Sequence, residues 1–350
     1  MFHSMFTTHG SCSFRHIRQR VARFYPIAAA LALAVAAGPS PALAGGISGT
    51  LSNFDTFYDN TDTPSIDAYG AEIELEDIHS SDVQTTYPSH YSSSVKNDVG
   101  DLGNGHFGTR IRFDGYNFPG TSGFIAPNPN PPSTNGHACV GTAGCEHFGF
   151  SASVQPTVMR FFWLDQSGSR IGTVPLTIPN PTWTYVPPAG AVPARIQAAV
   201  VVPEPVEVEP QLPDSLWLKI FVTETEQEVE LDDLVSDGVL VPHGEVETET
   251  EIEWEFLEGG EVFQVEADVP EPGKSIIRRY EYYKYTGPYS DEHEPTAPPW
   301  DGIGEFPPTA GAFIAANMVS VNLVPEPSSV CIALSGAGLF VLALRRREER

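Results

Sequence analysis

A strict alternation of glutamate with apolar or β-branched residues runs from Glu245 to Phe256, and it restricts the fold more than any other feature of this chain. Every second residue is a glutamate, and the residues between them end in Ile252, Trp254 and Phe256. Successive side chains of a β-strand point to opposite faces of a sheet, whereas a helix would scatter these apolar residues around its axis. The segment therefore predicts a strand with one buried face and one acidic face.

Short strand-like segments separated by turn residues fill most of the remaining chain, and no long segment has a convincing helical period. The other strands that we expect cover residues 73–78, 106–113, 148–154, 159–164, 171–178, 183–186, 196–202, 216–223, 276–285 and 313–323. Residues 165–169 predict a hairpin loop. Strands of this length at roughly ten-residue spacing predict an all-β fold of antiparallel β-sandwich or jelly-roll type.

The acidity of the chain is unevenly distributed. The formal net charge is −26, and residues 45–324 hold 11 Lys and Arg against 42 Asp and Glu, concentrated in residues 204–294. This charge argues against a nucleic-acid partner, because phosphate binding needs basic patches. The change in composition near Val202 predicts two β-rich domains, at 45–203 and 204–288, followed by a proline-rich spacer with a possible last strand at 289–323.

We expect the acidic strand face to be solvated, with its charges partly met by Arg278, Arg279 or Lys284 on a neighbouring strand. Such a charged face also resists aggregation between sheets. Two alternatives remain open, namely Ca²⁺ binding by the carboxylates and docking to a basic partner.

Residues 1–44 have the organisation of a secretory signal peptide. A basic segment without acidic residues precedes an apolar run at 27–37, and Ala42 and Ala44 place small residues before a cleavage point after Ala44. The apolar run is too short for a membrane-spanning helix, which needs about 20 residues. We therefore expect export.

The C-terminus has three parts in a fixed order. A VPEPSS string contains the first part, an apolar segment at 330–344 forms the second, and three arginines follow it directly. The residues of this pattern are Pro325, Glu326, Pro327, Arg345, Arg346 and Arg347. The apolar segment predicts a transmembrane helix, and the positive-inside rule places the arginines in the cytoplasm. The body would then lie outside the membrane.

This order resembles the PEP-CTERM sorting signal of exported bacterial proteins, and the resemblance is limited to residues 324–350. It implies processing near Pro-Glu-Pro by an exosortase, a membrane cysteine transpeptidase, and association with exopolysaccharide or biofilm matrix. VPEP also occurs at 202–205 and 269–272, where no apolar segment follows, so the short motif alone is not specific. A membrane anchor that is never processed is the alternative.

Two cysteines remain once the signal peptide and the tail are set aside, Cys139 and Cys145. In an oxidising compartment such a pair predicts a disulfide that closes a short loop. His137 and His147 flank the pair, and four such ligands can hold Zn²⁺, although zinc ligands are normally spaced differently.

Asp98, Asp101 and Asn104 form a loose group of oxygen ligands that is a weak candidate for Ca²⁺. Their spacing does not match an EF-hand loop, and Asp and Asn beside Gly are common turn residues. No other cofactor is expected.

The sequence contains no G-x-S-x-G, H-E-x-x-H or phosphate-loop motif, and we identify no catalytic residue. Its tryptophans suit a core better than a sugar-binding platform. We therefore expect an exported protein, anchored by its tail and then released to the cell surface or matrix, with a structural or adhesive role. A carbohydrate-binding module or a matrix-remodelling hydrolase is the alternative.

Overall fold

The computed structural model describes a β-rich body and none of the predicted signal peptide. The described residues are 45–59, 66–128, 131, 144–172, 175–176, 178–189, 191–193, 195–201, 215–225, 229–235, 250–268, 275–290, 294–296, 300 and 306–325. The predicted transmembrane segment at 330–344 lies outside these ranges.

Antiparallel strands make up most of the described chain, with one short helix. In chain order they are β1 (Gly45–Phe57), β2 (Gly70–Glu76), β3 (Val83–Tyr87), β4 (Tyr91–Val99), β5 (Gly108–Tyr116), β6 (Cys145–Ala152), β7 (Met159–Leu164), β8 (Thr182–Val186), β9 (Arg195–Val201), β10 (Leu216–Thr225), α2 (Leu231–Val235), β11 (Thr250–Leu257), β12 (Val262–Asp268), β13 (Ser275–Tyr285) and β14 (Ala310–Pro325). The predicted all-β antiparallel class is confirmed.

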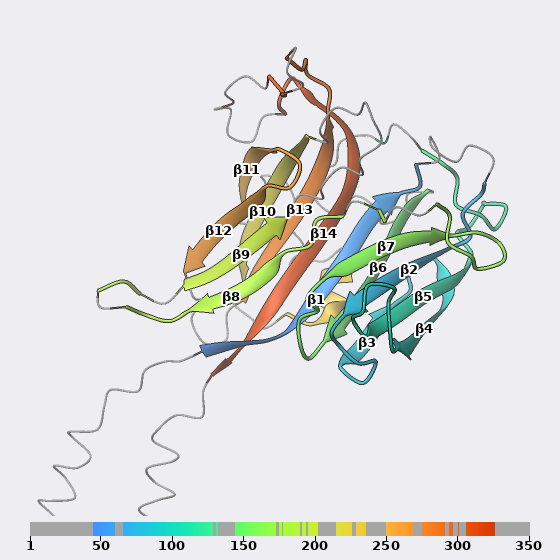
Figure 1. Cartoon of the computed structure of the whole chain (residues 1–350), viewed down its shortest axis with the longest axis horizontal. Coiled ribbons are helices and arrows are strands. Elements are labelled where there is room, and N and C mark those ends of the chain that lie inside the picture. The colour runs from blue at the N-terminus through green and yellow to red at the C-terminus, as the bar shows by residue number, and fades with distance from the viewer. Residues whose placement is uncertain are drawn as a thin grey trace, which may run out of the picture. The chain divides into compact units, whose positions relative to one another are not determined.

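The strands form three sheets (Figure 1). The largest has seven strands in the order β11-β10-β13-β14-β1-β6-β3. A four-stranded sheet has the order β4-β5-β2-β7, and a three-stranded sheet has the order β12-β9-β8. Both smaller sheets lie in front of the seven-stranded sheet in the view of Figure 1.

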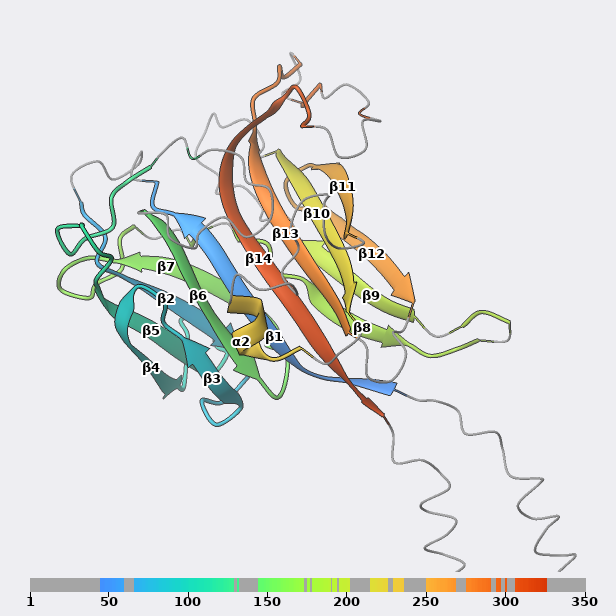
Figure 2. The ribbon, with the colours of Figure 1, turned by 180° about the vertical axis from the view of Figure 1, so that it is seen from behind.

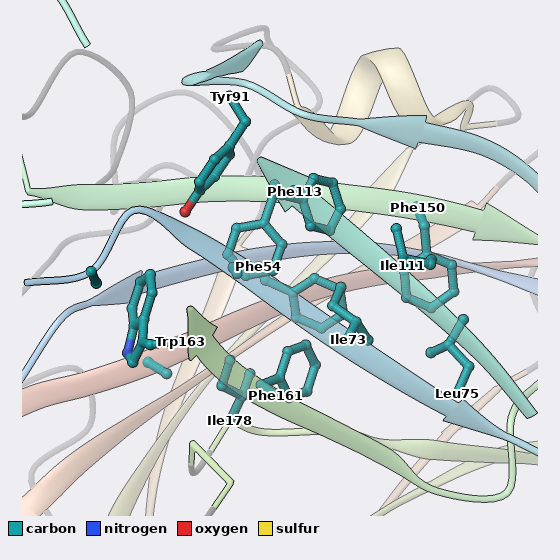
Figure 3. Packing of buried hydrophobic residues seen from close by; sticks show 14 of the residues in the cluster. Phe54, Ile73, Leu75, Tyr91, Ile111, Phe113, Phe150, Phe161, Trp163 and Ile178 are labelled. Carbon is teal, nitrogen blue, oxygen red and sulfur yellow. The ribbon is translucent and has the colours of Figure 1, made fainter. Parts of the chain in front are cut away.

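Each smaller sheet shares a hydrophobic core with one half of the seven-stranded sheet. Phe54, Phe148 and Phe150 of β1 and β6 pack with Ile73 and Phe113 of the four-stranded sheet, as the close view in Figure 3 shows for most of these rings. A second core joins Trp183, Ile196 and Val200 of the three-stranded sheet to residues of β10, β13 and β14. The molecule is therefore a sandwich in which one broad sheet is covered by two narrower ones.

The opposite face of the seven-stranded sheet is also covered. Helix α2 lies over β1 and β6 on this face (Figure 2), and its residues Leu231 and Leu234 pack against Leu51 and Met318. Farther along, Trp217 packs with Tyr283, Phe313 and partly buried aromatic residues. Because both faces of this sheet are covered, a buried polar side chain on it needs a hydrogen-bond or ion-pair partner.

The expected division into two β domains at 45–203 and 204–288 does not separate the sheets. Residues Gly45–Glu326 form one compact unit. β1, from the first segment, pairs with β14, and β9 pairs with β12 across the predicted boundary. The change of composition near Val202 therefore marks a change of charge and not a boundary between sheets. Local composition does not show which distant strands will pair.

The alternating pattern at the end of 245–256 is confirmed by β11. Ile252 is buried and Trp254 and Phe256 pack against the core, whereas Glu251 and Glu253 are exposed. Residues 245–249 lie outside the described part of the chain.

For the glutamates that the structure describes, those of β11, the expected cationic neighbours are wrong. β10 separates β11 from β13, so the glutamates lie opposite apolar residues of β10. Arg278 packs over the Trp183 ring, Arg279 is buried on the opposite face, and Lys284 pairs with Asp59.

Two further expectations need correction. The hairpin loop at 165–169 is present, because Asp165 accepts hydrogen bonds from the backbone of Ser167 and Ser169. The described residues of the expected strand at 171–178 form no strand, although Ile171 and Leu176 donate backbone hydrogen bonds to Trp163 and Phe161 of β7. The last strand expected at 313–323 is longer and forms the centre of the sheet as β14.

Candidate functional site

A row of charged side chains crosses the buried face of the seven-stranded sheet. Asp55 lies opposite His147 on one side and Ala316 on the other, and Ala316 in turn lies opposite Glu281. Lys219 follows Glu281 in the same row. All of these side chains are almost fully buried. Buried charges on this scale must be paired, since an unpaired charge in a core is strongly destabilising.

Arg279 links the two carboxylates of this row. Its Nη1 donates to Asp55, and its Nε donates to Glu281 Oε1 at 2.7 Å. Tyr283 donates its hydroxyl to the other oxygen of Glu281 at 2.7 Å. Burial alone would lower the pKa of Arg279, but the two carboxylates raise it above its usual value. The small side chain of Ala316 lies between the two carboxylates that the guanidinium joins.

His147, one of the zinc ligands considered from the sequence, lies in the core against Asp55 and the end of helix α2. Its Nδ1 lies 2.7 Å from Asp55 Oδ1, and its Nε2 lies 3.1 Å from the carbonyl oxygen of Val235. Both ring nitrogens are therefore engaged by neighbouring oxygen atoms of the fold. The Asp55–His147 pair is therefore a structural contact.

A cluster of metal-ligand residue types that ranges from a buried glutamate to an exposed histidine lies at the end of β2. Ligand atoms of Glu76, Asp77 and His106 lie within 4.8 Å of one another. His106 Nδ1 is 3.1 Å from Asp77 Oδ1 and 3.4 Å from Glu76 Oε1. Hydrogen bonding to Asp77 and the charge of Glu76 raise the pKa of His106. Arg160 donates to Glu76 Oε2 at 2.7 Å, so a cation already compensates this carboxylate.

The three weak calcium candidates have separate partners. Asp98 accepts the backbone N–H of Ser80, and Asp101 accepts the backbone N–H groups of Gly103 and Gly105. Asn104 donates to Glu76 Oε2 at 2.8 Å. The hydrogen bonds lower the pKa of Asp101, as is typical of a carboxylate that closes a turn. A calcium site at these residues stays a prediction.

A shallow hollow of about 510 Å³ lies beside the four-stranded sheet. Its lining includes Asp67, Tyr69, Asp165 and Gln166, which combine an aromatic ring with carboxylate and amide groups. Trp163, Trp183 and Trp217, by contrast, are buried in cores as expected. The sequence did not indicate the hollow, because its residues come from separate loops.

The two ends of the body meet in a two-stranded ribbon, which we call the terminal ribbon (residues 45–48 and 322–325). β6 pairing with β1 ends at Thr50, and β13 pairing with β14 ends at Ser320, so only β1 and β14 continue. The ribbon has four antiparallel pairs: Gly45–Pro325, Gly46–Val324, Ile47–Leu323 and Ser48–Asn322. Figure 1 shows the start of β1 beside the end of β14.

Gly49 separates the terminal ribbon from the sheet. The β1–β14 register shifts between Ser48 and Leu51, which marks a bulge. Gly49 has a φ of 71°, and a Cβ atom at this position would lie 2.0 Å from the carbonyl oxygen of Ala152. Only glycine suits both this left-handed conformation and this close approach.

The ribbon places two predicted processing points side by side. Gly45 directly follows the predicted cleavage point, whose residues Ala42 and Ala44 lie outside the described chain. Its partner Pro325 is the first residue of the predicted sorting motif. The remaining motif residues, Glu326, Pro327, Arg345, Arg346 and Arg347, also lie outside the described chain.

Comparison with known families decides the nature of this end of the chain. Residues 323–347 match the PEP-CTERM protein-sorting motif. The resemblance noted in the sequence is confirmed for this segment. No curated protein and no solved structure matches the chain. The PEP-CTERM segment implies an exported surface or extracellular protein that is targeted by an exosortase-type enzyme.

The PEP-CTERM match begins inside β14, so the motif and the folded body share residues 323–325. Among the described residues, no helix combines the length and apolar character that crossing a membrane requires. The anchoring helix expected at 330–344 stays a prediction.

One of the two cysteines of the predicted disulfide, Cys145, lies in the described part of the chain. Cys145 is fully buried at the start of β6 and is not a free thiol. Cys139 lies outside the described residues, so the pairing of Cys139 with Cys145 stays a prediction.

Proposed function

We propose that this protein is a non-enzymatic structural or adhesive component of the cell envelope or exopolysaccharide matrix. The observation that carries the proposal is the PEP-CTERM match at residues 323–347, directly at the end of the central strand β14. The signal peptide would export the chain, and the apolar segment at 330–344 would hold it in the membrane until an exosortase cuts near Pro325. The body would then reach the surface or matrix.

The terminal ribbon supports this proposal mechanically. Its four pairs extend about 13 Å beyond the point where the neighbouring strands end. An isolated two-stranded ribbon is marginally stable at best in water. Pro325 can therefore leave the ribbon and offer an extended backbone to a processing enzyme, while the sandwich behind it remains folded.

The sorting motif can be tested against a matched sequence in the same chain. We expect simultaneous replacement of Pro325, Glu326 and Pro327 by alanine to leave the protein unprocessed in the membrane fraction. The same replacement at Pro270, Glu271 and Pro272, a second VPEP string, should leave processing unchanged. Cell fractionation with intact-mass measurement distinguishes the two. Equal processing of both variants would contradict the proposal.

Carbohydrate binding is a second candidate, favoured by the hollow that contains Asp67, Tyr69 and Gln166. An aromatic ring beside polar groups suits a polyhydroxylated sugar. If the body binds matrix polysaccharide here, Tyr69→Ala should weaken retention on immobilised polysaccharide, whereas Tyr185→Ala, in β8 of the other small sheet, should not. Cleavage of the polysaccharide by the purified body would instead favour the hydrolase alternative.

A further inference from the structure

The end of β2 brings the carboxylates of two consecutive residues to the same place. Side chains of neighbouring residues in a strand normally point to opposite faces of the sheet. Glu76 is the last residue of β2, and Asp77, which follows it, has a φ of 62°. This left-handed conformation is uncommon outside glycine, asparagine and aspartate. It takes Asp77 out of the alternation of the strand, and its carboxylate lies within 4.8 Å of the Glu76 carboxylate.

The loop between β4 and β5 adds an imidazole to these two carboxylates. Asn104 holds this loop against β2, because its Oδ1 accepts the backbone N–H of His106 at 3.1 Å and its Nδ2 donates to Glu76 Oε2 at 2.8 Å. His106 Nδ1 then lies 3.1 Å from Asp77 Oδ1 and 3.4 Å from Glu76 Oε1. One ring nitrogen thus faces an oxygen atom of each carboxylate.

Hydrogen bonds within this cluster leave one buried oxygen without a donor. His106 Nδ1 carries at most one hydrogen, and Asp77 Oδ1 is the acceptor within ordinary hydrogen-bond distance, because 3.4 Å to Glu76 is longer. Among the described residues, Glu76 Oε1 accepts no hydrogen bond, although the Glu76 side chain is only 5% exposed. A buried carboxylate oxygen that faces an imidazole nitrogen without a shared hydrogen indicates room for a cation between them.

Neighbouring side chains hold the two carboxylates in position. Arg160 and Asn104 both donate to Glu76 Oε2, at 2.7 and 2.8 Å, which leaves Oε1 for another partner. The side chain of Thr157 hydrogen-bonds to Asp77 and lowers the pKa of this carboxyl. Carboxylates that bind metal ions are commonly oriented by such outer hydrogen bonds. Arg160 compensates one of the two negative charges, and the other remains for a bound ion.

We propose that Glu76, Asp77 and His106 form a binding site for one divalent transition-metal ion of the Zn²⁺ type. Ligand distances of about 2.1 Å place neighbouring ligand atoms about 3.0 Å apart at a right angle and about 3.4 Å apart at a tetrahedral angle. The two distances from His106 Nδ1, 3.1 and 3.4 Å, lie close to these values. An imidazole ligand favours Zn²⁺ and related ions over Ca²⁺, which takes oxygen ligands.

Three protein ligands leave at least one position of the ion open. This position would lie toward solvent, because the side chains of His106 and Asp77 are 50% and 32% exposed. Water or an oxygen ligand from outside the protein can fill it. The ion would also tie the loop before β5 to the end of β2 and so stabilise the four-stranded sheet. This inference is independent of the proposed sorting and matrix function.

The experiment titrates the purified protein, freed of metal by a chelator, with Zn²⁺ in a calorimeter. Wild-type protein should bind zinc and unfold at a higher temperature in its presence. His106→Gln and Asp77→Asn should each weaken zinc binding at least about tenfold. Asparagine tolerates the left-handed conformation that Asp77 adopts, so Asp77→Asn removes a ligand and preserves the backbone. The unfolding temperature without metal shows that each variant is folded.

His79→Gln is the matched control. His79 Nδ1 lies 3.7 Å from Asp98 Oδ1, and these exposed side chains form a histidine–aspartate contact that has no third metal ligand among the described residues. Its loss should therefore leave zinc binding unchanged. Absence of zinc binding in wild type, or an equal loss of affinity in His79→Gln and His106→Gln, would overturn the proposal. Calcium binding as tight as zinc binding would also contradict it, because it would exclude the imidazole as a ligand.

Discussion

At the scale of single residues, the structure depends on charges that the core must neutralise. Asp55, Arg279 and Glu281 are fully buried, and Arg279 donates hydrogen bonds to both carboxylates. Removing one partner of a buried ion pair leaves a charge that neither water nor the protein compensates. Loss of any one of the three residues is therefore expected to destabilise the fold.

Arg279→Met is expected to destabilise the fold by about 3–5 kcal/mol, because it leaves two carboxylates in the core without their shared cation. Urea unfolding measures the loss. Arg195→Met is the matched control, since the Arg195–Glu266 pair is 39% and 47% exposed and such surface pairs contribute about 0–1 kcal/mol. Equal losses for the two variants would show that the buried group contributes nothing beyond a surface pair.

The pattern of residues in the sequence did not predict this buried group of charges. Arg278 and Arg279 are adjacent in the sequence, yet strand alternation sends one toward Trp183 and the other toward Asp55, whose position is 224 residues away. Sequence reasoning finds alternation within a strand, whereas this group depends on which strands become neighbours.

At the scale of elements, two features of the sheet have different roles: the paired ends of β1 and β14, and the edge strand β11. The terminal ribbon contains the first residues of the PEP-CTERM match, 323–325, and the bulge at Gly49 marks where the ribbon begins. β11, at the end of the strand order, presents glutamates to solvent. Charged side chains on an edge strand oppose pairing with other chains.

Gly49→Ala should destabilise the body by more than about 1 kcal/mol, because the new Cβ combines a left-handed backbone with a clash against Ala152. Gly172→Ala is the control. Gly172 has a similar φ of 74° but no atom within 4 Å of the added Cβ. Thermal or urea unfolding compares the two. If the losses are the same, the close approach at the bulge has no energetic consequence.

Glu255 is expected to make the stability of the fold depend on pH. Burial, followed by the charges of Glu253 and Glu261, raises the pKa of Glu255 above its usual 4.5. The folded state then binds the proton more tightly than the unfolded state, so this contribution to stability falls as pH rises from 4.5 through the raised pKa.

Glu255→Gln should therefore gain stability relative to wild type at about pH 8, and the gain should shrink toward about pH 4. Unfolding midpoints in urea across this range test the expectation. Added salt should reduce the gain as well, because it screens the repulsion from Glu253 and Glu261. A gain that is constant with pH would exclude the titration of Glu255 as its cause.

At the scale of the whole molecule, the sequence predicted the fold class, several strands and the sorting tail, and it missed the connectivity. β7 was placed at its observed bounds, since its apolar residues and the following turn are local signals. The broad sheet, which combines β1, β6 and β3 with β10, β11, β13 and β14, was not foreseen. Its assembly needs the first and the last strand of the body to pair, and no local pattern records such a contact.

This pairing links the fold to export. Because β1 and β14 are neighbours at the centre of the sheet, the chain completes its sandwich only when both ends of the body are present. The same pairing puts Gly45 beside Pro325. The proposed signal-peptide cleavage and the proposed exosortase cleavage would therefore occur at adjacent points of the folded body.

Mapping both termini of the protein recovered from the cell surface or matrix tests the central claim most directly. Mass spectrometry should find an N-terminus at Gly45 and a C-terminus close to the Pro325–Pro327 motif, with the segment at 330–344 absent. Cells without exosortase activity should yield a membrane-bound form that retains this segment. A surface protein that still carries its C-terminus through Arg350 would contradict the account.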